Sequence, residues 1–326
     1  MSDIPDALPT YDQLPYKSGN PAKTAWGLFG DDDQVGMFNL QTPERIVQAA
    51  SLINKGKMFP MNWDQSLPSP PLYNRGAVRH TVMRRAGFGH HGDDVLDNFY
   101  TQQSSQWDAL THVGDFEHGF WGGVTNEWLL ENQDAPKLGI EHWAQRGIAG
   151  RAVLLDLGRW FESQGEPLTL DEYRPISADE VEACRAAQGV ELRDGDVLLI
   201  RIGWIGWYEQ TDFMKRQELS QMPNLAFPGL GCSEEMAAYL FDHHPSAVCS
   251  DNPALEAWPP PNFADPDGFL HHWIIGRFGM AIGEMFTLDA LAEDCAEDGV
   301  YESFFAAAPL NVSGGTGSPP NGLAIK

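Results

Sequence analysis

The chain has 326 residues, 42% of them hydrophobic, and its 46 acidic residues outnumber its 21 Lys and Arg, giving a formal net charge of −25. Nucleic acids and anionic membrane surfaces are recognised by basic patches, so this charge argues against both as partners. No apolar run is long enough for a membrane-spanning helix, and the first residues lack the pattern of a signal peptide. The four cysteines are scattered and form no C-x-x-C pair. We therefore expect a cytoplasmic protein with reduced thiols.

The N-terminal part of the chain predicts an arm, a helix and a loop. Residues 1–25 are polar and Pro-rich and predict an arm that wraps the body or a neighbouring molecule, with one domain over residues 26–326. Thr42 and Pro43 are typical of a helix start, and Gly56 is a candidate for its end. Residues 86–98 are Gly-rich and carry His and Asp, which predicts a surface loop or a lid over a site.

The chain from residue 140 onwards alternates strand and helix patterns. Apolar runs predict buried strands at residues 150–156, 195–204 and 247–251, and a capping box opens a helix over residues 177–188. A further helix is predicted from residue 233 to about residue 241. The predicted fold is α/β, one domain with a mixed central sheet and helices packed against it.

Residues 102–112 gather amides, a carboxylate and an imidazole in one short stretch. If this stretch is extended, Gln102, Gln106 and Asp108 point from the same face of the strand, because they are separated by even numbers of residues. His112 keeps that phase if the strand continues, and folds back over the site if the chain turns. Such side chains can hold a divalent ion or hydrogen-bond a polar substrate. The alternative is an ordinary polar strand end.

The same stretch resembles the signature of the putative cyclase family of metal-dependent hydrolases, which includes kynurenine formamidase and isatin hydrolase. Gln106-Trp107-Asp108, followed by His112, is similar to the Gln-Trp-Asp-x-x-x-His motif of the family's longer members. Short members have His where this chain has Gln102, and Gly-Thr where it has Ser104-Ser105. The resemblance runs from about residue 26 to residue 325 and implies the family's swivelling β/β/α arrangement.

A second stretch resembles the family's distal motif, in which a His precedes two apolar residues, a Gly-rich turn and a Glu at the end of a strand. The Glu is Glu284, and aligning Ile274 and Ile275 with the apolar pair makes His271 the counterpart of the His. His272 is the competitor, on the opposite face if the segment is a strand. The sequence leaves the choice between the two open.

The resemblance implies a site with one divalent ion, Mn²⁺ or Zn²⁺, and leaves a second ion open. His112 and Glu284 are the catalytic candidates, with His112 moving a proton. The implied reaction is hydrolysis of a small lactam, lactone or aryl formamide by a homo-oligomeric enzyme. With amides at two ligand positions, the alternative is a family member that binds a small molecule without turnover. The candidate metal ligands are Gln106, Asp108, His112, His271 and Glu284, and the candidate substrate contacts are Gln102, Trp107, His118, Phe120 and Trp121.

Overall fold

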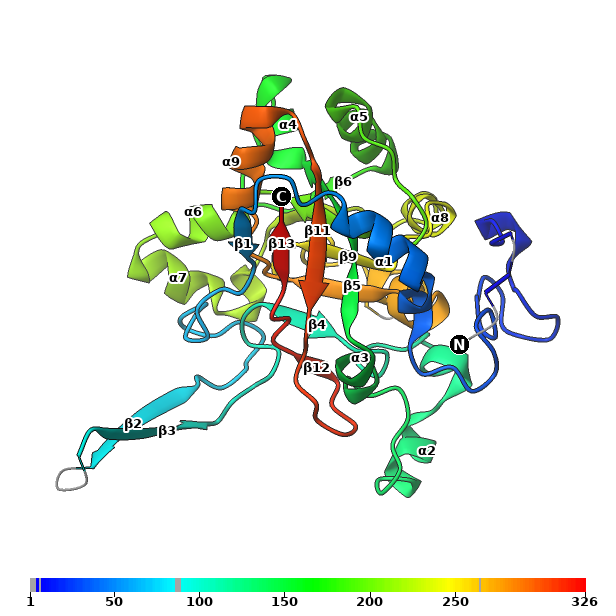
Figure 1. Ribbon diagram of the computed structural model, residues 1–326, viewed down its shortest axis with the longest axis horizontal. Coiled ribbons are helices and arrows are strands. Elements are labelled where there is room, and N and C mark those ends of the chain that lie inside the picture. The colour runs from blue at the N-terminus through cyan, green and yellow to red at the C-terminus, as the bar shows by residue number, and fades with distance from the viewer. Residues whose placement is uncertain (1–3, 6, 86–88, 264) are drawn as a thin grey trace.

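A large mixed sheet forms the centre of the computed structural model, which describes residues 4–5, 7–85, 89–263 and 265–326 (Figure 1). Among these residues, nine strands pair in the order β1-β13-β11-β5-β7-β9-β10-β4-β12. The neighbours from β5 to β10 are parallel, and the other pairs are antiparallel. The strands are β1 (Met58–Pro60), β4 (Gln106–Asp108), β5 (Ile148–Asp156), β7 (Val197–Arg201), β9 (Ala247–Ser250), β10 (Ala281–Glu284), β11 (Glu302–Ala307), β12 (Gly317–Ser318) and β13 (Leu323–Ile325).

Two smaller sheets and a set of helices complete the described fold. One small sheet pairs β2 (Arg79–Arg85) with β3 (His91–Asp97), and the other pairs β6 (Arg174–Ile176) with β8 (Pro228–Leu230). The α-helices are α1 (Pro43–Ala50), α2 (Asn126–Glu131), α3 (Glu141–Arg146), α4 (Leu157–Ser163), α5 (Ala178–Gln188), α6 (Trp204–Gln210), α7 (Phe213–Leu219), α8 (Glu234–Asp242) and α9 (Asp289–Asp298). The short helices are η1 (Tyr11–Gln13), η2 (Gly36–Leu40), η3 (Trp121–Gly123), η4 (Met222–Asn224) and the π-helix η5 (His272–Arg277). No helix of the described part is long and apolar enough to cross a membrane.

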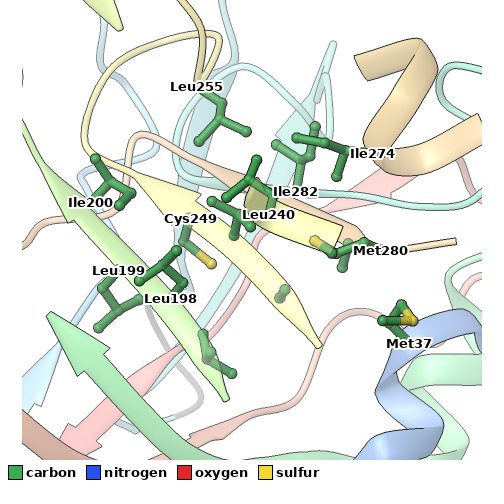
Figure 2. Close-up of a cluster of buried hydrophobic side chains, with 14 of the residues drawn as sticks. Met37, Leu198, Leu199, Ile200, Leu240, Cys249, Leu255, Ile274, Met280 and Ile282 are labelled. Atoms are coloured by element: carbon green, nitrogen blue, oxygen red, sulfur yellow. The ribbon is translucent and has the colours of Figure 1, made fainter. Parts of the chain in front are cut away.

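The parallel strands form the core because both of their faces are covered. Leu198, Leu199 and Ile200 of β7 are completely buried, and they pack with Ile282 of β10 and Leu240 of α8 in the cluster of Figure 2. An uninterrupted apolar run is what a parallel strand between two layers of helices requires. The predicted α/β fold with a mixed central sheet in one domain is confirmed.

The described part of the N-terminal segment lies against the body. Tyr11 is buried, its backbone N–H donates to Asp242 of α8 at 2.6 Å, and its hydroxyl donates to Glu234 at 2.9 Å. The segment therefore packs on α8. Part of the predicted arm, residues 1–3 and residue 6, lies outside the described residues.

The structure corrects the prediction in three places. Helix α1 begins after the Thr42 cap as predicted but ends at Ala50, well before Gly56, which has a φ of +66° in the following turn. Residues 91–97 of the predicted loop are strand β3, paired with β2, while residues 86–88 lie outside the described part. The strand predicted at residues 195–204 is confined to Val197–Arg201, and α6 begins at Trp204. The segment after residue 270, whose form the sequence left open, is helical.

Candidate metal centre

Strand β4 carries the first motif and aligns it with the second. It lies between β10 and β12, with Asp108 opposite Ile282 and Gln106 opposite Glu284 of β10. Gln106 and Asp108 point to one face of β4, as the even spacing predicted. Trp107 points to the other face, where its fully buried ring packs edge-on against the core rings Phe38, Trp143, Phe286 and Phe305.

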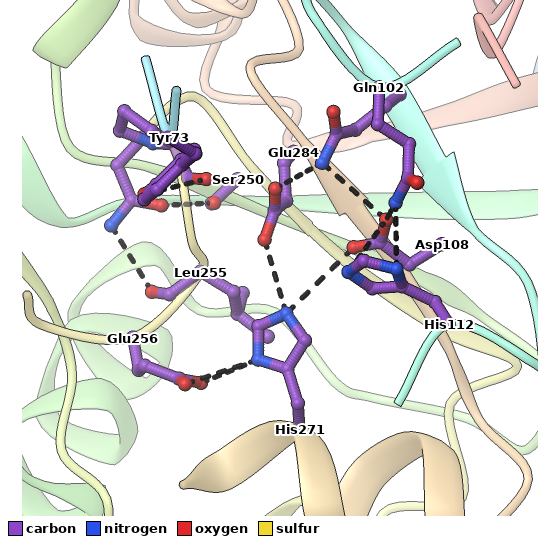
Figure 3. Close-up of polar contacts among 12 residues, drawn as sticks. Tyr73, Gln102, Asp108, His112, Ser250, Leu255, Glu256, His271 and Glu284 are labelled. Atoms are coloured by element: carbon purple, nitrogen blue, oxygen red, sulfur yellow. Dashed lines mark hydrogen bonds and ion pairs between the residues drawn. The ribbon is translucent and has the colours of Figure 1, made fainter. Parts of the chain in front are cut away.

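Asp108, His271 and Glu284 converge at the end of β10 (Figure 3). One potential ligand atom from each lies within 4.8 Å of the others, and all three residues are buried. His271 Nε2 is 3.2 Å from Glu284 Oε1 and 3.8 Å from Asp108 Oδ2. The three donors come from β4, from the start of η5 and from β10, so the fold unites the two sequence motifs.

The helical form of the distal segment decides between the two histidines. His271 is the residue that precedes η5, and its imidazole faces the carboxylates. His272 turns away, and its Nδ1 lies 2.7 Å from the carbonyl oxygen of Gly114. Close backbone packing fixes this helix, because a Cβ at Gly276 would lie 2.2 Å from the backbone nitrogen of Asp115.

The donor set fits a divalent cation. Asp108 Oδ2 is buried and has no hydrogen-bond partner among the described residues. An unsatisfied carboxylate oxygen in the interior is costly, and a bound cation would satisfy it. Two carboxylates and one imidazole are ligands that both Mn²⁺ and Zn²⁺ accept.

The two glutamine amides hydrogen-bond the carboxylates. Gln102 donates from Nε2 to Asp108, and Gln106 donates from Nε2 to Glu284. The Gln106 oxygen is held by Arg75, whose Nη1 donates to it across 3.3 Å. The amide nitrogen of Gln106, rather than its oxygen, therefore faces the centre in this structure, and its role as a metal ligand stays a prediction.

His112 lies at the rim of the centre. Its Nε2 is 3.8 Å from Asp108 Oδ1, its Nδ1 is 3.1 Å from Gln102 Nε2, and its side chain is 26% exposed. The side chain of Asp108, by contrast, is fully buried. His112 is thus the imidazole of this group that meets solvent.

Burial and mutual charge shift the protonation of the centre. Burial, together with the charge of Asp108, raises the pKa of Glu284 to about 8. Burial alone would also raise the pKa of Asp108, but the charges of His112 and His271 hold it below its ordinary value. Burial lowers the pKa of His112. Holding both carboxylates in the ionised form is unfavourable in this buried site, and a bound cation would make it favourable.

Glu256 is a part of the site that the sequence analysis missed. Both of its carboxylate oxygens lie 3.1 Å from His271 Nδ1, and the residue is completely buried. This contact leaves Nε2 of His271 directed at Asp108 and Glu284, and carboxylates commonly orient metal-binding imidazoles in this way. The available signal was the acidic residue that ends the segment Asn252-Pro253-Ala254-Leu255-Glu256 after strand β9.

Aromatic side chains line one side of the centre. The half-buried ring of Phe269 stacks on the imidazole of His271, with centroids 4.4 Å apart and planes 2° from parallel. Tyr73 packs edge-on against Trp258 at 5.0 Å. A cavity of about 420 Å³ opens beside Gln102, with Arg75 also in its lining.

The other predicted substrate contacts lie elsewhere. Trp121 is buried and donates from its indole nitrogen to Asp33 at 3.0 Å, and Phe120 is part of the main core. His118 is exposed and pairs with Asp115 at 2.6 Å. In the described part of the chain these three residues, like Trp107, have no polar or ring contact with the metal-binding group. Gln102 alone of the predicted substrate contacts lies at the centre.

The fold and site define a class: an α/β protein with a buried Asp–His–Glu group at the end of a mixed sheet. The family model described as putative cyclase matches residues 51–257. A crystal structure of a novel cyclase is 33% identical, covers 93% of this chain and 99% of its own, and superposes with a TM-score of 0.80. The chain belongs to the putative cyclase family, which confirms the resemblance.

More distant structures share the fold. Isatin hydrolase A from Labrenzia aggregata bound to benzyl benzoate is 13% identical and has a TM-score of 0.57, covering 86% of this chain and 97% of its own. An isatin hydrolase bound to the product analogue thioisatinate is 17% identical and has a TM-score of 0.53, covering 84% of this chain and 93% of its own. No curated protein matches the chain. At these identities the likeness is one of fold.

Proposed function

We propose that this protein is a metal-dependent hydrolase that cleaves the C–N or C–O bond of a small lactam, lactone or aryl formamide. The observation that carries the proposal is the convergence of Asp108, His271 and Glu284 within 4.8 Å, in a buried site. Membership of the cyclase family and the isatin hydrolases among structures of the same fold support it. When bound, a Mn²⁺ or Zn²⁺ ion supplies Lewis acidity and lowers the pKa of water.

In this proposal the protein's own residues hold and move the proton. His112 is at the solvent-exposed rim, and its lowered pKa keeps it neutral near pH 7. Neutral His112 can serve by accepting a proton from a water molecule and then passing it, as the imidazolium, to a leaving nitrogen or oxygen. With Gln102 donating to Nδ1, the ring hydrogen of neutral His112 occupies Nε2. Rotating the Gln102 amide by half a turn would present its oxygen to Nδ1 and free Nε2 to accept a proton. Glu284 is the second proton-carrying candidate.

The aromatic wall supports a flat substrate. Phe269 is half-buried and parallel to the His271 ring, so a planar acyl compound that reaches the centre meets an aromatic face. Phe263 packs against both Phe269 and Trp258, and Trp258 packs against Tyr73, so these rings extend the wall. We therefore propose the aromatic wall, rather than Phe120 and Trp121, as the set of rings that contacts the substrate.

Elemental analysis of the purified protein, beside its Asp108→Asn variant, tests the proposal. We expect about one Mn or Zn per wild-type chain and loss of the metal in the variant, which keeps the side-chain shape but removes the charge. Metal-loaded protein should then open lactams or lactones, or deformylate aryl formamides. Absence of metal from both proteins after dialysis against excess Mn²⁺ would refute the proposal.

A second function, binding without turnover, is favoured by one observation. Gln102 and Gln106 donate hydrogen bonds to Asp108 and Glu284 and so partly satisfy these carboxylates without a metal. A binding protein would show saturable affinity for a flat cyclic amide in calorimetry, with no product after prolonged incubation. A metal-dependent product distinguishes the hydrolase.

A further inference from the structure

Arg75 lies half-buried at the edge of the metal centre and forms no ion pair with an Asp or Glu of the described residues. Its Nη1 donates to the backbone carbonyl of Gln102 and, across 3.3 Å, to the side-chain oxygen of Gln106. The two carboxylates behind these glutamines, Asp108 and Glu284, are candidate metal ligands, so a bound ion would take up their charge. The positive charge of Arg75 is therefore available to a ligand.

The edge of the guanidinium that best matches a carboxylate is unused. Nε and Nη2 of Arg75 have no acceptor in the part of the chain that the structure describes, and their N–H bonds run parallel from one edge of the planar group. In Arg79 the same two nitrogens donate to the carboxylate of Asp97, at 3.2 and 2.6 Å. Two parallel donors recognise a carboxylate in a geometry that Lys cannot offer. Arg75 thus retains a two-point donor for such a group.

The backbone that leads to Arg75 is held in an unfavourable conformation. Tyr73 and Asn74 both have a φ of +56°, in the left-handed region that residues with a Cβ rarely adopt. Such conformations persist where the surroundings impose them, and they concentrate at functional sites. The Tyr73 ring packs edge-on against Trp258, and the guanidinium carbon of Arg75 lies 5.4 Å from the centroid of the same ring. The turn therefore fixes the guanidinium at the end of the aromatic wall.

The cavity of about 420 Å³ beside the metal centre is lined by Arg75 and by no acidic residue of the described chain. Gln102 connects this cavity to the centre, because its backbone carbonyl accepts from Arg75 while its side chain donates to Asp108 (Figure 3). The cation and the metal-binding group are thus separated by one glutamine, a span comparable to one aromatic ring. The other lining residues, all uncharged, are Asn98, Phe99, Tyr100, Thr101, Gln102 and Thr316.

We propose that Arg75 binds a carboxylate group of the substrate that is separate from the bond to be cleaved. The proposal rests on the hydrolase function proposed above and narrows its substrates to planar lactams, lactones or aryl formamides that carry a carboxylate. The scissile carbonyl then lies at the metal centre, the ring lies along the aromatic wall, and the carboxylate accepts from Nε and Nη2 of Arg75. Arg75 is a specificity-determining residue, which selects anionic substrates in a protein whose overall charge repels them.

Binding of matched charged and neutral ligands to the Mn²⁺-loaded protein tests the proposal. The charged ligands are 2-, 3- and 4-formamidobenzoate, and the neutral partner of each is the formamidobenzamide of the same shape. We expect at least one carboxylate to bind about 10- to 100-fold more tightly than its carboxamide in titration calorimetry. Where product forms, the same preference should appear in kcat/KM.

Variants assign the preference to one side chain. Arg75→Gln should lose it, because affinity for the carboxylate falls while affinity for the carboxamide stays. Arg75→Lys keeps the charge without the parallel donors and should retain part of it. The matched control is Arg79→Gln, which removes a 75% exposed guanidinium and should leave both affinities at the wild-type level. Metal content should equal that of the wild type in all three variants.

Three results would overturn the proposal: no binding of the carboxylates, equal affinity of the wild type for both members of every pair, or a parallel loss of both affinities in Arg75→Gln. The last would show that Arg75 only supports Gln102 and Gln106. If Arg75→Gln does not fold, the wild-type comparison and Arg75→Lys decide. Product formation tests the hydrolase separately. Charge-selective binding without product would contradict hydrolysis and keep the carboxylate site, whereas product without charge preference would do the reverse.

Discussion

Gln106 and Glu284 lie opposite each other on β4 and β10, and the amide of the first donates to the carboxylate of the second. The two residues are 178 positions apart in the chain. This one pair joins the Gln-Trp-Asp motif to the distal motif, because the strand register that places Gln106 also places Asp108 beside Glu284 and His271. The strand register of the sheet, as well as the identity of the side chains, therefore determines the geometry of the metal centre.

Glu256 should control the affinity of the centre for a divalent ion. Replacing it with Ala removes both contacts to His271 Nδ1 and frees the imidazole to turn, which should weaken Mn²⁺ binding about 10- to 100-fold. Glu256→Gln keeps an acceptor for Nδ1 and should lose less. Titration calorimetry measures both, and wild-type affinity in Glu256→Ala would contradict the assigned role.

His112 should be needed for turnover but not for metal retention. In His112→Ala, we expect kcat to fall about 10²- to 10⁴-fold, because the proton-carrying group is removed while Asp108, His271 and Glu284 remain. His272→Ala is the matched control, since that imidazole faces Gly114 and should leave kcat nearly unchanged. Metal content, measured on both variants, should equal that of the wild type. A loss of metal in His112→Ala would instead make this residue a ligand.

Gly276 should tolerate no side chain. Gly276→Ala places a methyl group 2.2 Å from the backbone of Asp115 and should lower the free energy of unfolding by about 1–3 kcal/mol. Gly122→Ala is a useful comparison, because its Cβ meets open space and its cost comes only from a φ of +70°. Denaturant unfolding compares the two. Equal stability of Gly276→Ala and wild type would show that η5 can shift away from the loop.

The loss of unfolding free energy at acidic pH should come in part from Glu180. Its hydrogen bond with Arg174, together with the capping box at the start of α5, lowers its pKa to about 2. Because the folded pKa is below the unfolded value, the stabilisation is complete above about pH 4.5 and is lost as the pH falls towards about 2. The side chain is 27% exposed, so solvent screening limits the effect to about 1 kcal/mol or less. Urea unfolding of wild type and Glu180→Gln should therefore differ at pH 6 and differ progressively less as the pH falls towards 2, and a constant difference would contradict this assignment.

The sequence contains enough to predict the strands of the core and the first half of the site. Even spacing placed Gln106 and Asp108 correctly on one face of β4, since period-two alternation on a strand is a local property. Gln102 also reaches Asp108, but from the turn before β4 rather than from an extended strand. Glu256 was missed because its contact with His271 depends on how the segment after β9 packs, which no local pattern encodes. The helical form of residues 272–277 was missed for a related reason: in a buried helix and a buried strand, apolar runs look alike. The same limit explains why Trp107, Phe120 and Trp121 were predicted as substrate contacts although they pack in the core. An aromatic residue beside a polar motif can face either the site or the core.

The alternation of side chains between the two faces of β4 limits which insertions and deletions this segment can accept. Trp107 fills the core on one face while its two neighbours serve the metal centre on the other, within a strand of three residues. Inserting or deleting a single residue just before Gln106 would reverse both faces, sending a carboxylate into the aromatic cluster and an indole into the centre. Loss of activity and loss of folding would then come from the same event. Length variation among relatives should therefore avoid the segment between Ser105 and Asp108 and concentrate in exposed connections away from the strands of the centre.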